Sequence, residues 1–394
     1  MNAYSDIIIV GAGPAGLSFA RRLANAPLSI TIIEKSPLES ITQPAYDGRE
    51  IALTHRSKEI MEQLGMWQRV PADEIYQLKD AKVWDGDSSY QLHFPQPTHA
   101  RGGATDRLGN LISNHNIRQA AYDAVCEQDN VTLLCGTGVQ TAKTSDEEAT
   151  VVLDNGQVLR SRLLVCADSR FSQTRRQIGI AADMHDFGRT VIVCRFRHEI
   201  SNEHTAVEFF QYGRTLALLP LEEHLTNCVI TIDADKAPAL LALSDEDFAA
   251  DIEQQLKGLL GKMEKADSVH TYPLVGVHAN TFCTTRAALI GDAAVGMHPV
   301  TAHGFNLGLE SADILGSLIE EAVRDCQDIG SKSLLERYNA KHQLNTRPLY
   351  HGTNAMVKLF TNESTPAKLL RSAVVRISNN LPPLKKWITH QLTG

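Results

Sequence analysis

The sequence of 394 residues has no run of about 18 apolar residues, so it predicts no segment that spans a bilayer. It also lacks the pattern of a secretory signal, because the early apolar run at residues 7–10 follows Asp6 rather than basic residues. The seven cysteines are widely scattered and form no CxxC pair, which excludes a predicted disulfide framework or metal site. We therefore expect a reduced, cytoplasmic setting.

The sequence as a whole also has no excess of positive charge. The formal net charge of -8 argues against a protein that mainly binds nucleic acid. Residues 341–394 differ from the rest, since they hold eight basic residues and a single acid, Glu363. This basic region, with Trp387 beside Lys385 and Lys386, is consistent with peripheral association with the inner face of a membrane or with a biosynthetic complex. A solvated helical face is an equally open interpretation, and Arg175-Arg176 is interpreted as a solvated helix start.

Short apolar runs followed by helical patterns predict a parallel sheet. Residues 7–10 lead through a glycine-rich turn into a helical pattern at 17–24, and residues 29–34 are the next expected strand. This is a βαβ unit. Further buried strands are expected at 163–167 and 287–290, so three separated pieces of chain assemble one sheet.

The intervening sequence predicts a second layer. Strand-like runs follow one another between residues 190 and 272, interrupted by a helix at 245–260, which indicates a mostly antiparallel sheet. Other segments are expected to form a hairpin at 78–94, helices at 108–125 and 306–324, and a helical region after residue 333 that is broken at Pro382-Pro383.

The first glycine-rich turn is the motif Gly11-Ala12-Gly13-Pro14-Ala15-Gly16. It follows a strand and opens a helix, whose N-terminal amides attract a pyrophosphate. Glu34 ends the second strand, where a carboxylate accepts hydrogen bonds from a ribose diol, and Lys35 follows it. The motif predicts a dinucleotide site but does not distinguish FAD from NAD. A glycine turn of purely structural origin is the alternative.

A second glycine-bearing strand end favours a flavin. The segment runs through Gly291-Asp292, then Met297-His298-Pro299, then Gly304-Phe305-Asn306 at a helix start. Asp292 is expected to accept from a ribityl hydroxyl, and the amides near Gly304 to stabilise negative charge on a reduced flavin. A nicotinamide dehydrogenase does not need this second glycine-bearing motif. His298 and His303 flank the turn and are candidates for proton transfer, although a histidine that only hydrogen-bonds the turn is the commoner case.

Taken together, these motifs resemble the FAD-dependent aromatic hydroxylases, and within them the ubiquinone-biosynthesis branch. The resemblance runs nearly end to end. Besides the two glycine motifs, it rests on Asp47-Gly48-Arg49-Glu50-Ile51-Ala52-Leu53, Leu108-Gly109-Asn110-Leu111-Ile112-Ser113-Asn114, Ala167-Asp168 with Ser172 and Arg175, and Val357-Lys358-Leu359-Phe360 with Pro382-Pro383-Leu384-Lys385.

The resemblance implies an α/β fold: a Rossmann-like FAD-binding domain (residues 1–75, 101–185 and 280–330), an inserted antiparallel-sheet substrate domain (76–100 and 186–279) and a helical C-terminal region (331–394). It implies non-covalent FAD and hydroxylation of a polyprenylated phenol or quinol by a flavin C4a-hydroperoxide formed with O2. By motif, Arg49 and Asn114 would lie beside FAD, Asp168 would contact FAD and NAD(P)H, and Pro299 would line the flavin ring.

The chain departs from the family pattern at four positions. The family usually has Asp-Gly at Asp168-Ser169, Gly-Gln-Gly at Ala302-His303-Gly304, Asp at Ser311 and Glu at Ser113. The first departure leaves the electron donor open. A flavin hydroxylase of a soluble phenol, and a dehydrogenase without flavin, stay as alternatives.

Overall fold

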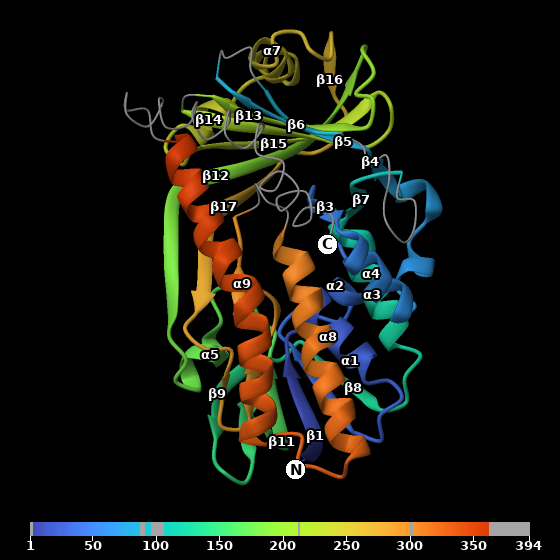
Figure 1. Cartoon of the computed structure of the whole chain (residues 1–394), viewed down its shortest axis with the longest axis vertical. Coiled ribbons are helices and arrows are strands. Elements are labelled where there is room, and N and C mark those ends of the chain that lie inside the picture. The colour runs from blue at the N-terminus through green and yellow to red at the C-terminus, as the bar shows by residue number, and fades with distance from the viewer. Residues whose placement is uncertain (1–2, 87–90, 96–105, 212, 299–302, 362–394) are drawn as a thin grey trace.

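A computed structural model describes residues 3–86, 91–95, 106–211, 213–298 and 303–361 (Figure 1). The first sheet has the order β18-β19-β11-β1-β2-β8, in which β1 pairs in parallel with β11 and β2, and β9 and β10 extend it antiparallel from β11. Its strands are β1 (Ala3–Val10), β2 (Ile30–Glu34), β8 (Val131–Cys135), β9 (Val139–Thr144), β10 (Ala149–Leu153), β11 (Val158–Cys166), β18 (Cys283–Thr284) and β19 (Ala287–Leu289).

The second sheet is largely antiparallel and has the order β20-β17-β12-β15-β14-β13-β5-β6, with β16 paired to β12. Its strands are β5 (Asp80–Asp85), β6 (Gln91–Phe94), β12 (Ala182–His198), β13 (Thr205–Gln211), β14 (Arg214–Pro220), β15 (Leu225–Asp233), β16 (Met263–Lys265), β17 (His270–Ala279) and β20 (Val295–Gly296). A small third sheet has the order β3-β7-β4 and comprises β3 (Glu50–Leu53), β4 (Tyr76–Leu78) and β7 (Gly109–Ser113).

Helices cover both sheets. In Figure 1, α7 lies over the outer face of the second sheet, and α9 runs from the first sheet up to the second. The helices are α1 (Pro14–Arg22), α2 (Glu39–Thr42), α3 (His55–Gln63), α4 (Asn114–Val125), α5 (Gln173–Gln177), α6 (Ala237–Leu241), α7 (Asp245–Gln255), α8 (His303–Arg324) and α9 (Lys332–Thr361), with short 3-10 turns η1 (Trp67–Arg69), η2 (Ala72–Glu74) and η3 (Gly291–Ala293). None of the helices in the described ranges is long and apolar enough to cross a membrane.

The predicted fold class is confirmed. The β1-α1-β2 unit, the return of β11 to pair with β1, and the later strand β19 beside β11 are all present. Residues 7–10 of β1 and 163–166 of β11 are apolar because both faces of the sheet are covered there, and Ile7, Ile9 and Leu164 are fully buried. The break expected at Pro382-Pro383 lies outside the described residues.

The prediction of one helix over residues 108–125 was wrong in its first part. Residues Gly109–Ser113 form β7, which pairs antiparallel with β3, and the helix begins only at Asn114. The spacing of Leu108, Leu111 and Ile112 suits a helix as well as a strand. Pairing with a strand more than fifty residues earlier in the chain decides the outcome, and local spacing carries no information about that pairing.

Two buried histidines join α9 to the sheets. His342 on α9 is 1% exposed, stacks on Tyr338 with ring centroids 5.9 Å apart, and lies 5.1 Å from the ring of Phe282. Burial, with a smaller effect from His278, lowers the pKa of His342 to about 3. Burial likewise lowers the pKa of His278 on β17 to about 4. Both rings are therefore neutral in the folded protein at neutral pH.

We predict that His342→Phe makes the protein less sensitive to acid. The unfolded chain binds protons at His342 below pH about 6.5, whereas the folded chain does so only near its lowered pKa, so stability falls as the pH drops through this window. One histidine contributes a slope of up to about 1.4 kcal/mol per pH unit. Urea unfolding between pH 7 and about 4.5 measures it, and the exposed His224 replaced by Phe is the control. Equal slopes for wild type and His342→Phe would contradict the prediction.

Candidate functional site

The turn between β1 and α1 has no room for side chains on its inner side. Gly11 has a φ of +110°, and a Cβ there would lie 2.4 Å from the carbonyl oxygen of Ala167. A Cβ at Gly16 would lie 2.1 Å from the carbonyl oxygen of Gly11. The glycines at these two positions bring α1 close to the strand ends, and Pro14 occupies the first turn of α1, where its missing N–H costs no hydrogen bond.

Glu34 lies at the mouth of this turn. Its Oε2 accepts a hydrogen bond from the amide of Ala12 at 2.8 Å, and its Oε1 accepts from the amide of Ser36 at 2.9 Å. The two amides fix the orientation of the carboxylate. Each carboxylate oxygen has a second lone pair, so Glu34 keeps the capacity to accept from a diol.

The second motif packs directly onto the first. A Cβ at Gly291 would lie 2.7 Å from the Cβ of Ala15 on α1, and a Cβ at Gly308 on α8 would lie 3.3 Å from the Cα of Gly291. The Oγ of Ser311 accepts from the amide of Gly291 at 3.1 Å and donates to the carbonyl oxygen of Gly308 at 2.6 Å. Ser311, where the family usually has Asp, thus holds the Gly291 turn against α8.

Asp292 follows this turn and forms an ion pair that the sequence analysis missed. Nε and Nη2 of Arg170 donate to Oδ2 of Asp292 at 3.2 and 2.9 Å, and Nη1 of Arg170 donates to the carbonyl oxygen of Val275 on β17. Both contacts use the same carboxylate oxygen, so Oδ1 of Asp292 is not engaged by Arg170. Arg170 therefore ties the end of the first sheet to the second sheet.

The structure corrects the interpretation of Arg175 as part of a solvated helix start. Arg175 is 1% exposed, and its Nη1 donates to the carbonyl oxygen of Ala293 at 2.9 Å. Burial lowers its pKa, although the charge of Asp168 acts in the opposite direction. Oδ1 of Asp168 is itself buried and accepts no hydrogen bond within the described part of the chain. Ser169 closes the same turn, since its Oγ accepts from the amide of Phe171 at 3.2 Å.

Arg49 and Asn114 converge on Asp47. Nη2 of Arg49 and Nδ2 of Asn114 both donate to Oδ2 of Asp47, at 2.6 and 2.8 Å. Burial opposes ionisation of Asp47, but Arg49 and Asn114 outweigh it and hold the pKa of Asp47 below its usual range. The guanidinium of Arg49 lies 5.2 Å from the ring centroid of Tyr272 on β17, and the hydroxyl of Tyr272 donates to the carbonyl oxygen of Asp47. This loop therefore contacts the second sheet while the Arg49 side chain stays 45% exposed.

A buried ion pair locks the neighbouring strand onto the second sheet. Nη2 of Arg195 on β12 donates to Oε1 of Glu50 on β3 at 2.7 Å, and the Glu50 side chain is completely buried. Burial raises the pKa of Glu50 to about 7 in spite of the charge of Arg195. The pairing joins residues far apart in the sequence, so no local pattern could have indicated it.

The remaining predicted residues lie around the start of α8. Nδ2 of Asn306 donates to the carbonyl oxygen of Ala52, and its Oδ1 accepts from the amide of Thr54 at 3.2 Å. His298 is 3% exposed and meets the ring of Phe187 edge-on at 5.1 Å. Burial, and then the charge of Arg189, lower the pKa of His298 to about 4, so its ring is neutral near pH 7. His303 is buried at the first position of α8, whereas Pro299 lies outside the described residues.

The arrangement fits a flavin dinucleotide. A Cβ added at Gly13 or at Gly304 would meet no atom of the described residues within 4 Å, so these residues leave space at the N-termini of both α1 and α8. Helix N-termini present free amides and a partial positive charge to such a space. Glu34 and Asp292 place carboxylate oxygens beside the two turns. Two motifs from opposite ends of the sequence are thus brought to one site, as predicted, but the role of each residue stays a prediction.

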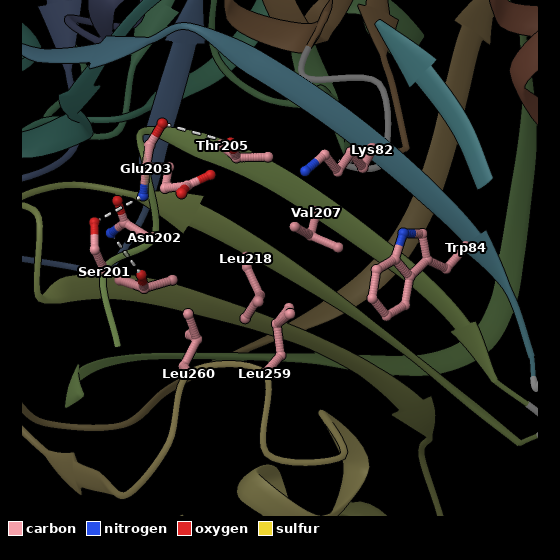
Figure 2. Close-up of a pocket in the computed structure, with 11 residues that line it drawn as sticks. Lys82, Trp84, Ser201, Asn202, Glu203, Thr205, Val207, Leu218, Leu259 and Leu260 are labelled. Atoms are coloured by element: carbon pink, nitrogen blue, oxygen red, sulfur yellow. Dashed lines mark hydrogen bonds between the residues drawn. The ribbon is translucent and has the colours of Figure 1, made fainter. Parts of the chain in front are cut away.

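A separate cavity of about 90 Å³ lies on the other face of the second sheet (Figure 2). Trp84, Val207 and Leu218 line it from the strands, and Leu259 and Leu260 close it. Ligand pockets usually measure 300–1,000 Å³, so this cavity is too small for a dinucleotide. It is therefore distinct from the site at the glycine turns.

Comparison with known proteins agrees with this geometry. Residues 4–349 match the family model described as an FAD binding domain. The chain belongs to this FAD-binding family. It is 64% identical over 394 residues to ubiquinone hydroxylase UbiM of Neisseria meningitidis, covering 100% of this chain and 86% of that protein. It is 31% identical to ubiquinone hydroxylase UbiL of Rhodospirillum rubrum, covering 99% and 90%, and 24% identical to 3-demethoxyubiquinol 3-hydroxylase of Escherichia coli, covering 98% and 97%. The resemblance to the ubiquinone-biosynthesis branch is confirmed.

Solved structures of the family share the fold at much lower identity. The p-nitrophenol 4-monooxygenase PnpA of Pseudomonas putida superposes with a TM-score of 0.77 at 16% identity, covering 100% of this chain and 99% of that one. The flavin-dependent brominase Bmp2 superposes with a TM-score of 0.76 at 15% identity, covering 99% and 94%. These likenesses establish the fold alone.

We predict that Gly13→Ala weakens FAD binding without destabilising the protein. The backbone of Gly13 has a φ of -75°, which alanine adopts freely, and the added methyl group meets no atom in the described part of the chain. It would instead occupy space needed by the pyrophosphate, which corresponds to a loss of affinity on the order of tenfold to a hundredfold. Flavin titration followed by fluorescence measures this. Gly352→Ala on α9 adds a methyl group to equally open space far from the site and is the matched control. Equal FAD affinity for both variants would contradict the prediction.

Proposed function

We propose that this chain is an FAD-dependent monooxygenase that hydroxylates the aromatic ring of a polyprenylated phenol or quinol in ubiquinone biosynthesis. The observation that carries the proposal is the packing of the Gly11–Gly16 turn and α1 against the Gly291 turn and α8, with space left open by the described residues at Gly13 and at Gly304. Identity of 64% to a ubiquinone hydroxylase over the whole chain supports the substrate class. The match to an FAD binding domain argues against a dehydrogenase without flavin.

In this proposal each residue of the site binds a different part of FAD. The amides at the start of α1 face the pyrophosphate, Glu34 accepts from the ribose, and Asp292 accepts from a ribityl hydroxyl through the oxygen that Arg170 leaves unused. Arg49 supplies positive charge beside the phosphates. The amides near Gly304 stabilise negative charge on the reduced ring. Bound FAD supplies the redox chemistry with O2, and the protein supplies position and exclusion of water.

Electrons come from NAD(P)H in this proposal. Asp168, whose Oδ1 has no hydrogen-bond donor within the described ranges, lies at the end of β11 beside the cofactor turn and is the proposed contact for the donor. Ser169 replaces the usual glycine but only closes the turn through its own hydroxyl, so it leaves the Asp168 carboxylate available.

The basic C-terminal region is proposed to bring the enzyme to the inner face of a membrane or to a biosynthetic complex, where a polyprenylated substrate resides. Of its eight basic residues, Lys341, Arg347 and Lys358 lie on the described part of α9, and the other five lie outside the described residues. Positive charge close to anionic lipids favours such association.

Spectroscopy and product analysis test the proposal. We expect the purified protein to show flavin bands near ~450 nm that bleach when NADH or NADPH is added without air and return with O2. With isotopically labelled O2, a prenylated phenol should gain one labelled oxygen atom. A soluble phenol without a prenyl chain is the control substrate. Equal turnover of both phenols would favour the alternative of a soluble substrate, and reoxidation with no labelled product from either would refute the proposed hydroxylation.

A further inference from the structure

The second sheet turns one face toward the cofactor site. Val191, Val193, Val229 and Tyr272 form a cluster with Leu274 and Phe187 on this inner face, and Phe187 contacts His298. The loop at Gly48 reaches the same face, since a Cβ there would lie 2.8 Å from Cγ2 of Val193. On the opposite, outer face, Val207, Phe209 and Leu218 pack with Phe248 and Ile252 of α7.

Glu208 on β13 lies on the inner face. Successive side chains of a strand alternate between faces, and the neighbours of Glu208, Val207 and Phe209, both belong to the outer core with α7. Phe210, which shares the face of Glu208, packs instead with Val83, Leu92 and the end of α9. Glu208 is therefore an acidic side chain on the face that looks toward the cofactor site.

The surroundings of Glu208 are apolar. Its cross-strand neighbours are Ala217 on β14 and Val83 on β5. Within the described part of the chain Glu208 has no ion pair and no hydrogen bond from its carboxyl group. Burial raises the pKa of Glu208 to about 8, yet its surface is only partly covered by protein atoms. A partly exposed carboxyl group on this face is open to contact with a bound molecule.

Other charged groups near this position are few. On the same face, two residues along β13 in either direction, stand Ala206 and Phe210, and the flanking positions on β14 and β5 are Thr215, Leu219, Ala81 and Asp85. Asp85 is paired with Phe210 rather than with Glu208. The end of α9 packs near β13 through Met356 and Leu359, and Lys358 beside them is exposed. No opposite charge among the described groups neutralises Glu208.

The distance from the cofactor loop suits an aromatic ring. Val193, which touches the Gly48 loop, pairs with Val229, then Ala217, then Glu208 in one row across β12, β15, β14 and β13. The row crosses three spacings between neighbouring strands, each of roughly 4.8 Å, so Val193 and Glu208 lie about 14 Å apart. A substrate ring against Val229 and Ala217 would thus lie between the cofactor site and the Glu208 carboxyl group.

We propose that Glu208 is a catalytic residue that contacts the ring hydroxyl of the substrate and removes its proton. This inference rests on the proposed function and names a base for the substrate hydroxyl. The O–H bond of the ring hydroxyl breaks and its proton forms an O–H bond with the Glu208 carboxylate. The electron pair stays on the ring oxygen and raises the electron density of the ring carbon that receives oxygen from the O2 reaction. After the ring loses its C–H proton to solvent, Glu208 returns its proton to the ring oxygen, so that the product leaves as a neutral diol and Glu208 is again a carboxylate.

Two readouts test the role of Glu208 with the full-length FAD-loaded enzyme. Without reductant, ultraviolet difference spectra of bound ortho-prenylphenol report its ionisation across a pH series. We expect the wild type to ionise this phenol below the pH at which it ionises in water, and Glu208→Gln to abolish the shift. With NAD(P)H and O2, Glu208→Gln should lower the rate of product formation by a factor on the order of 10²–10⁴ while reduction of FAD continues. Glu208→Asp should restore part of both signals.

Glu203→Gln is the matched control, because it makes the same chemical change at an exposed residue that lines the cavity on the outer face. It should behave as the wild type, and FAD content and thermal unfolding verify that each variant is folded. If the wild type ionises the phenol and Glu208→Gln does not, but no hydroxylated product forms, the role of Glu208 stands and the proposed function fails. If product forms and Glu208→Gln matches the wild type in both readouts, or the wild type does not ionise the phenol, the role of Glu208 is overturned.

Discussion

The close packing of α1, the Gly291 turn and α8 is the constraint on which the rest of the structure depends. At Gly11, Gly16 and Gly291 a side chain would collide with the backbone or side chain of a neighbouring segment, at 2.1 to 2.7 Å. The contact of Gly291 with Ala15 joins segments that are far apart in the sequence. In the proposed function, their meeting directs the N-termini of both helices at an anionic cofactor. Ser311 serves the same packing through two short hydrogen bonds.

The second sheet must also be fixed relative to this site, since in the proposed function it carries the surface that faces the substrate. Three polar connections do so: Arg170 between Asp292 and Val275, Arg195 with Glu50, and Tyr272 with the Asp47–Arg49 loop. A buried ion pair is weak evidence of stability, because desolvation offsets the attraction between the charges. The geometric effect of these connections is clearer. Each of them forms only when the two sheets hold one particular position relative to each other. The inner face is thereby held at a set distance from the cofactor site.

The sequence allowed prediction of the elements whose signal is local. The apolar runs that became β1, β2 and β19, and the glycines of both turns, have their cause within a few residues, and the resemblance to a family extended them to a whole fold. The segment Gly109–Ser113 failed because a partner strand far away in the sequence decides between strand and helix there. Arg170 and Glu208 were missed, and Arg175 was assigned to a solvated helix start, for a related reason. Their importance lies in what surrounds them, and an arginine in the sequence does not reveal that it is 1% exposed.

In a fold that is shared by enzymes with different reactions, a small number of residues must determine which reaction takes place. A p-nitrophenol monooxygenase and a brominase share this architecture with TM-scores of 0.77 and 0.76, so the fold by itself does not select a substrate. In the proposed function, residues on the inner face can select it, since they face the cofactor site. On this face the row from Val193 to Glu208 is apolar except for its last member. An apolar row that ends in a carboxyl group suits a ring that carries an apolar chain and one ionisable hydroxyl, and it is poorly suited to a substrate charged along its length.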